Sequence, residues 1–76
     1  MQVLETGITT EYIKLDQLLK FTGIAENGAD AKAMVLEGMV FFNGEPCEMR
    51  GKKVRAGDKV TVEFEDETVE IIVNQE

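Results

Sequence analysis

Residues 27–44, with the sequence NGADAKAMVLEGMVFFNG, decide the fold because they combine a helix cap, a helix stop, a strand and a tight turn. Asn27 suits a helix cap, since its side-chain oxygen can accept from the free amides of the first turn. Gly38 follows the last apolar position of the pattern, as a left-handed C-terminal cap requires. Asn43-Gly44 readily adopts the positive φ angles of a two-residue turn. We therefore expect a helix between Asn27 and Gly38 and a strand before the turn.

The apolar spacing on either side predicts a second helix and a hairpin. Leu15, Leu18, Leu19 and Thr22 follow the i, i+3, i+4, i+7 rule of an amphipathic helix, and Gly23 ends it. Later in the chain, alternation with polar residues predicts two strands joined at residues 65–67. The side chains expected to face inward from the helix of residues 28–37 and from the strands are Ala31, Met34, Val35, Val40, Phe42, Val54, Val60, Val62, Phe64, Val69, Ile71 and Val73.

Two short segments complete the expected sheet. Residues 1–6 read as a short edge strand, and Pro46 restricts residues 45–49 to an edge strand or a loop because proline cannot donate a ladder hydrogen bond. The predicted fold class is α+β: two short helices packed on a small, mostly antiparallel sheet of four to five strands.

Length and composition exclude several classes of protein. We expect the 76 residues to form one domain with a small core, which leaves little room for a substrate cavity and argues against an enzyme. No apolar run could cross a bilayer and the first residues do not resemble a signal peptide, so a cytoplasmic protein is expected. With a single cysteine, Cys47, and no histidine, neither an internal disulfide, nor a metal, nor another cofactor is expected, and Cys47 is expected to be a buried small residue.

The charge is unevenly distributed along the chain. The formal net charge is −7, yet residues 50–59, RGKKVRAGDK, hold five of the eight basic residues against one acid. Residues 1–49 carry three lysines against eight acids, and residues 60–76 carry six acids and no base. The net charge alone argues against a polyanionic partner, but the chain is acidic with one basic segment.

The ordered set of motifs resembles a known family. It comprises Lys14-Leu15-Asp16, Leu18-Leu19, Ala31, Gly38, Val40, Asn43-Gly44, Val54, Gly57-Asp58 and Val60. These residues resemble the S4-like RNA-binding domain, or αL motif, with the motif core at residues 12–63 and an added hairpin strand at residues 68–74. The Gly28, Ala31 and Lys32 pattern is similar to short, free-standing bacterial members. Where the wider family usually has arginine at the start of helix one and Ser-Arg at the start of helix two, this chain has Lys14 and Asn27-Gly28, which weakens two phosphate contacts.

The resemblance implies a function without catalysis. It implies binding of structured RNA, such as ribosomal RNA, on the ribosome or an assembly intermediate, by a monomer that can also meet ribosomal or assembly proteins. Phosphates would be held by the amides of both helix N-termini and by basic side chains. Those implied at the site are Lys14, Lys32, Arg50, Lys52, Lys53 and Arg55, with Lys59 at the margin. Recognition of RNA shape is expected, because the sequence lacks the stacked aromatic residues of single-strand readers.

Two other interpretations of the same residues remain open. The basic segment can be a solvated loop that keeps a small domain soluble. Alternatively, the chain can be an acidic protein-interaction module that docks through a sheet edge or through the surface around Phe41. Salt dependence of binding would separate this second interpretation from RNA binding, since an apolar protein contact responds little to salt.

Overall fold

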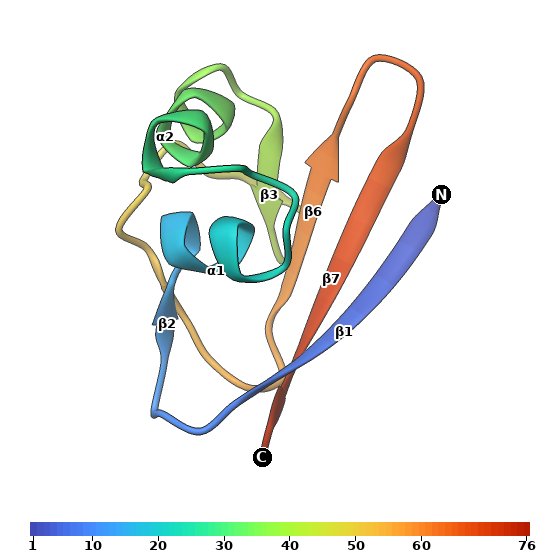
Figure 1. Cartoon of the computed structure of the whole chain (residues 1–76). Helices are drawn as coiled ribbons and strands as arrows, with labels where there is room; N and C mark the ends of the chain where they lie inside the picture. The colour runs from blue at the N-terminus through green and yellow to red at the C-terminus, as the bar shows by residue number, and fades with distance from the viewer.

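Two helices pack on one face of a five-stranded sheet, and a separate two-stranded sheet lies beside them (Figure 1). The computed structural model describes residues 1–76. Its elements, in chain order, are β1 (Gln2–Ile8), β2 (Ile13–Lys14), α1 (Leu15–Phe21), α2 (Gly28–Leu36), β3 (Val40–Phe42), β4 (Glu45–Pro46), β5 (Lys53–Val54), β6 (Lys59–Glu63) and β7 (Thr68–Gln75). The strand order in the larger sheet is β1-β7-β6-β3-β4, and β2 pairs with β5. The predicted α+β class is confirmed.

The local signals around α2 act as the sequence predicts. The Asn27 side chain accepts a hydrogen bond from the Asp30 amide at 2.9 Å, which caps the helix. Gly38 has a φ of +79° just beyond the helix, a conformation that glycine adopts without steric cost. Asn43 and Gly44 both have positive φ, as a hairpin turn of this type requires. This turn connects β3 to β4, which form an antiparallel pair.

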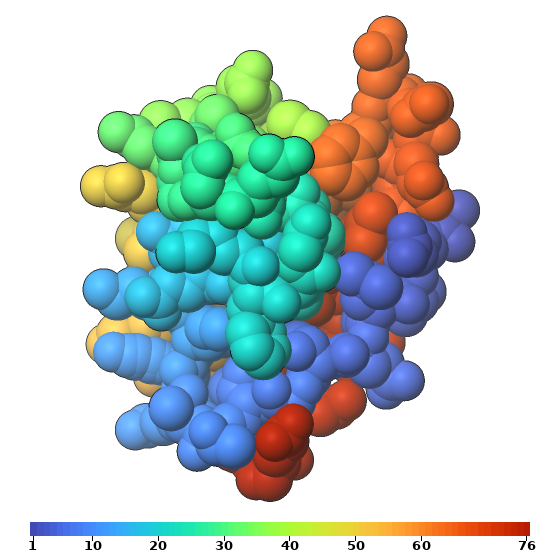
Figure 2. All heavy atoms as spheres, in the orientation of Figure 1, coloured from blue at the N-terminus to red at the C-terminus, as the bar shows by residue number.

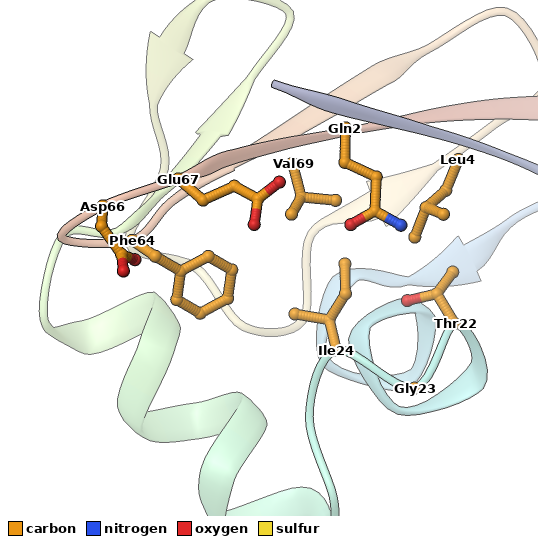
Figure 3. Close-up of a pocket in the computed structure, with 9 residues that line it drawn as sticks. All are labelled: Gln2, Leu4, Thr22, Gly23, Ile24, Phe64, Asp66, Glu67 and Val69. Atoms are coloured by element: carbon orange, nitrogen blue, oxygen red, sulfur yellow. The ribbon is translucent and has the colours of Figure 1, made fainter.

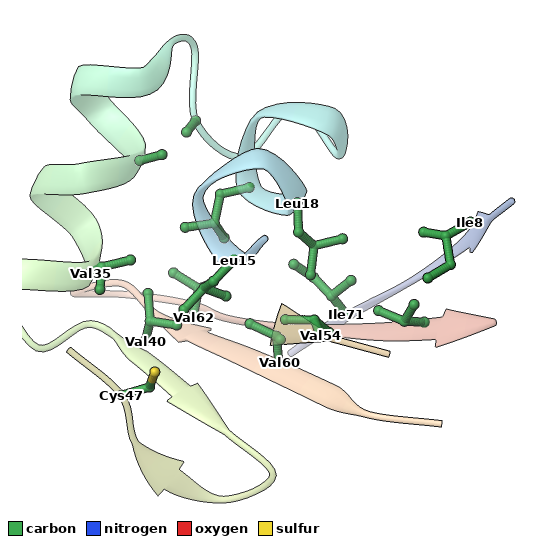
Figure 4. Close-up of a cluster of buried hydrophobic side chains, with 14 residues drawn as sticks. Ile8, Leu15, Leu18, Val35, Val40, Cys47, Val54, Val60, Val62 and Ile71 are labelled. Carbon is green, nitrogen blue, oxygen red and sulfur yellow. The ribbon is translucent and has the colours of Figure 1, made fainter. Parts of the chain in front are cut away.

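The core lies between the helices and the sheet (Figure 4). Helix α1 contributes three fully buried leucines, Leu15, Leu18 and Leu19, as its spacing predicts. The cluster also contains Ile8, Ala25, Ala31, Val35, Val40, Cys47, Val54, Val60, Val62, Ile71 and Val73. Met34, Phe42 and Phe64 are half-buried at its margin, and Val69 is buried. The inward faces predicted for the strands and the burial of Cys47 are therefore confirmed.

The sheet contains one parallel pair, at the edge strand predicted near the N-terminus. This strand, β1, is longer than expected and runs parallel to β7, with Gln2 opposite Val69 and Ile8 opposite Gln75. The other pairings in the sheet are antiparallel. At the opposite edge, the structure resolves the alternative left open for residues 45–49: Glu45 and Pro46 form the edge strand β4, and the chain then continues as a loop.

Neither helix is long and apolar enough to cross a membrane.

Candidate nucleic-acid interface

The short β2–β5 ladder places two lysines directly opposite each other. Its two residue pairs are Ile13 with Val54 and Lys14 with Lys53. Val54 is fully buried and Ile13 packs against the core, whereas both lysines are exposed. Like charges in directly opposed positions destabilise a ladder. The register therefore sets two like charges at opposed positions, and a bound anion would relieve their repulsion.

The basic loop, residues 50–55, is hydrogen-bonded through its backbone to the start of α1. The Leu15 amide donates to the Lys52 carbonyl at 2.9 Å, and the Asp16 amide donates to the Arg50 carbonyl at 3.0 Å. The Gln17 amide donates to the Asp16 carboxylate at 2.8 Å. The first-turn amides of α1 thus have partners within the protein, and the expectation that amides at both helix N-termini contact phosphate stays a prediction. These same bonds position the loop while leaving its side chains available.

Aromatic rings support three of the basic side chains. The Lys53 ammonium nitrogen lies 5.0 Å from the centre of the Tyr12 ring, and the Arg55 guanidinium carbon lies 5.9 Å from it. The Lys52 ammonium nitrogen lies 4.9 Å from the centre of the Phe42 ring, and Lys52 is half-buried rather than fully exposed. Cation–π contacts restrict these flexible chains without neutralising their charge. The sequence did not predict this role for Tyr12 or Phe42, although Tyr12 immediately precedes the ladder.

A hydrogen-bonded turn holds the far end of the loop. The Asp58 carboxylate accepts from the Arg55 amide at 2.8 Å and from the Asn43 side-chain amide at 3.2 Å. The Asn43 side-chain oxygen accepts in turn from the Lys59 amide at 2.9 Å. Asn43 therefore connects the β3–β4 turn to the turn that precedes β6. Asp58 therefore serves as a turn residue.

The structure brings together five of the seven basic residues expected at the site. The loop residues and Lys14 meet at the β2–β5 ladder, and residues 50–55 emerge beside residues 10–14 at the left of the space-filling view (Figure 2). We call this set the basic surface: Lys14, Arg50, Lys52, Lys53 and Arg55. None of these five side chains forms an ion pair, since the one ion pair in the structure joins Lys59 to Glu70.

The other two predicted residues have no direct contact with this set. Lys59 starts β6, whose next residue, Val60, faces the core, so Lys59 points to the sheet face away from the helices. There its ammonium group lies 3.9 Å from the Glu70 carboxylate. Lys32 is exposed on α2, and no ion pair, hydrogen bond or cation–π contact connects its side chain to the basic surface.

A shallow hollow of about 360 Å³ borders the basic surface. It is lined by Thr10, Glu11, Tyr12, Lys14 and Gln17. Its place next to the lysine ladder would let a group of a bound ligand enter beside the Lys14 ammonium. No cluster of three or more histidine, cysteine, aspartate or glutamate side chains is placed to hold a metal ion. The basic surface can therefore attract anions through its lysine and arginine side chains.

Comparisons with known proteins show the family of this chain. A family model described as S4 domain matches residues 6–72. The chain is 41% identical over 57 residues to the probable ribosome maturation protein RlbA of Bacillus subtilis (strain 168), covering 75% of this chain and 80% of that protein.

A solved structure supports the fold. Heat shock protein 15 of Vibrio cholerae, described as trimeric in its structure, superposes with a TM-score of 0.73 at 26% sequence identity. The match covers 84% of this chain and 64% of that one, so this chain spans slightly less than two thirds of its structural neighbour. The family model, by contrast, extends from β1 into β7 and includes every residue of the basic surface. The chain therefore belongs to the S4 domain family.

Proposed function

We propose that this protein binds structured RNA, such as ribosomal RNA, through its basic surface and without catalysing a reaction. The observation that carries the proposal is the opposition of Lys14 and Lys53 without an acidic partner. Unpaired like charges held by a ladder cost stability, and an RNA phosphate supplies the missing counter-charge. We assign Lys32 and Lys59 to the periphery of the site, and residues 12–63 to the RNA-binding core that the strand at residues 68–74 completes.

The net negative charge of the chain is compatible with this role. At physiological salt the screening length is about 8 Å, so acids on the other side of the molecule weaken the basic surface little. Five of the six acids after residue 59 lie in β6, β7 and their connection, whereas the basic surface is built on β2, β5 and the loop before it. Charge separation between elements lets one molecule be acidic overall and attract a polyanion locally.

The relatives support a ribosomal setting for this RNA. One relative is named as a probable ribosome maturation protein, and the match covers 75% of this chain and 80% of that protein. We infer that the protein acts in the cytoplasm on ribosomal RNA or a ribosomal particle, where assembly proteins can also meet it. We propose that the protein binds this RNA as a monomer.

The salt dependence of binding tests the proposal. We expect the purified protein to bind a structured ribosomal RNA fragment with a slope of about −3 to −5 in a plot of log affinity against log salt concentration, as four to six phosphate contacts require. Fluorescence anisotropy over a series of potassium chloride concentrations measures this slope. A slope near zero, or no binding at low salt, would contradict RNA binding and favour a protein-interaction module.

Replacing Lys14 by glutamate should stabilise the protein and weaken RNA binding at the same time. The variant places an acid opposite Lys53 and a negative charge at the N-terminus of α1, each worth some tenths of a kcal/mol to about 1 kcal/mol. We expect the free energy of unfolding to rise by about 0.5–1.5 kcal/mol. RNA affinity should fall roughly tenfold, because one phosphate contact becomes a repulsion. Urea denaturation and anisotropy measure the two effects.

The matched control is Lys20→Glu at the other end of the same helix. Lys20 is exposed and lies in the last turn of α1, so this variant has the same charge change but an unfavourable interaction with the helix dipole. It should lose a little stability and keep its RNA affinity within about twofold. If both variants lose RNA affinity equally, net charge and not Lys14 determines binding.

A further inference from the structure

A second hollow lies on another part of the molecule, where β1, the end of α1 and the β6–β7 turn meet (Figure 3). Its volume is about 450 Å³, within the range of pockets that hold small ligands or side chains. It is lined by Gln2, Leu4, Thr22, Gly23, Ile24, Phe64, Asp66, Glu67 and Val69. None of these residues belongs to the basic surface, so the pocket is a distinct feature.

The pocket combines an apolar wall with an acidic rim. Leu4, Ile24 and Phe64 are only half-buried, although Ile24 and Phe64 also pack against the core. Figure 3 shows the Phe64 ring and the Ile24 side chain on the pocket wall, with the Glu67 carboxylate directed between Phe64 and Gln2. A ligand that fills the space would therefore cover apolar surface that now contacts water.

The rim carries negative charge that nothing in the protein neutralises. Asp66 and Glu67 are exposed and take part in no ion pair, and Glu65 lies next to them on the turn. No lysine or arginine lines the pocket, and none follows Lys59 in the chain. An occupant should therefore be cationic as well as apolar, and phosphate-rich RNA is disfavoured here.

The pocket and the basic surface lie on different sides of the molecule. In Figure 2 the β6–β7 turn and β1 lie at the right, whereas residues 50–55 emerge at the left. RNA held at the basic surface would thus leave the pocket open to a second partner.

We propose that this pocket docks a segment of a second protein in which apolar side chains alternate with arginine or lysine. An apolar side chain of the segment packs against Ile24 and Phe64, and its neighbouring cations pair with Asp66 and Glu67. The proposal goes beyond RNA binding and does not depend on it, because no residue is shared between the two sites.

The test uses the isotope-labelled full chain and a synthetic probe peptide, acetyl-KLRFRK-amide. We expect the peptide to shift the amide resonances of Gly23, Ile24, Phe64 and Val69 in a titration followed by nuclear magnetic resonance. A second peptide, acetyl-KSRSRK-amide, has the same charge without the apolar side chains, and it should bind at least fivefold more weakly. Equal binding of the two peptides, or no shift at millimolar peptide, would overturn the proposal.

Charge reversal at the rim separates docking from general attraction. Asp66→Lys with Glu67→Lys should weaken binding of acetyl-KLRFRK-amide about tenfold, since two exposed ion pairs become repulsions. The control, Glu37→Lys with Glu45→Lys, changes the net charge equally at exposed positions outside the pocket and should weaken binding less than twofold. If both variants lost affinity for the peptide equally, the proposal would be overturned. It would also be overturned if a ribosomal RNA fragment shifted the amide resonances of the same pocket residues.

Discussion

A chain in which Lys52, Lys53 and Arg55 are all replaced by glutamate is expected to lose at least about a hundredfold in affinity for structured ribosomal RNA while remaining folded. Three cations that we propose as phosphate contacts become three anions, so attraction would be replaced by repulsion at each position. The loop itself should persist, because the Lys52 and Arg50 carbonyls hold it to α1 through the backbone. The variant has no cation to place over the Tyr12 and Phe42 rings, but the new pairing of residue 53 with Lys14 partly compensates. Anisotropy at low salt measures the affinity, and circular dichroism checks the fold.

A second charge-reversed chain shows whether position matters. Lys20→Glu combined with Phe21→Glu changes charge in the same direction, at two exposed positions on the last turn of α1. We expect this chain to retain most of its affinity, since neither side chain belongs to the basic surface. The location of the RNA site would be wrong if the triple variant bound as tightly as the unmodified protein, or if both variants failed alike.

Truncating Leu18 to alanine is expected to cost about 2–5 kcal/mol of the free energy of unfolding. Leu18 is fully buried between α1 and the sheet (Figure 4), so the substitution leaves a cavity that the surrounding side chains fill only in part. A protein of this length is stable by about 4–11 kcal/mol, at roughly 0.05–0.15 kcal/mol per residue. One truncated leucine should therefore remove a large share of the total, as urea denaturation would measure.

The matched control is the same substitution at Leu36. This leucine ends α2 with 56% of its surface exposed, so truncation removes little packing, and alanine is the better helix former. We expect its free energy of unfolding to stay within about 0.5 kcal/mol of the unmodified protein. Similar losses at Leu18 and Leu36 would show that the core does not lie where α1 meets the sheet.

The sequence predicted the parts of the fold that depend on neighbouring residues. Asn27, Gly38 and the Asn43-Gly44 turn each act through backbone groups only a few positions away, so their local chemistry suffices to place helix and turn. The three leucines of α1 and the alternating strands likewise define their buried faces by spacing alone. Phe64, Phe42 and Met34 face inward as predicted but are only half-buried. The spacing of apolar residues predicts the face on which a side chain lies, but not how deeply that side chain is buried.

Features that join distant segments could not be predicted in the same way. The parallel pairing of β1 with β7 could not be predicted from either strand. The same alternation of apolar and polar residues fits a parallel or an antiparallel neighbour. The β2–β5 ladder has two residues in each strand, which is too short for periodicity to reveal. The candidate site depends on this ladder: the basic residues could be named from the sequence, but the opposition of Lys14 and Lys53 and the support from Tyr12 could not.

The pairing of β1 with β7 also determines when the protein can finish folding during its own synthesis. Residues 1–63 contain both helices and most of the core, yet β1 lacks a hydrogen-bonded neighbour until Thr68–Gln75 has left the ribosome. Because β1 and β7 are far apart in the sequence, their pairing forms slowly. Until β7 is in place, the edge of β6 and the apolar side of β1 are exposed to other chains. A nascent chain stalled before β7 should therefore be the form most prone to aggregation, and release of this last strand the step that protects it.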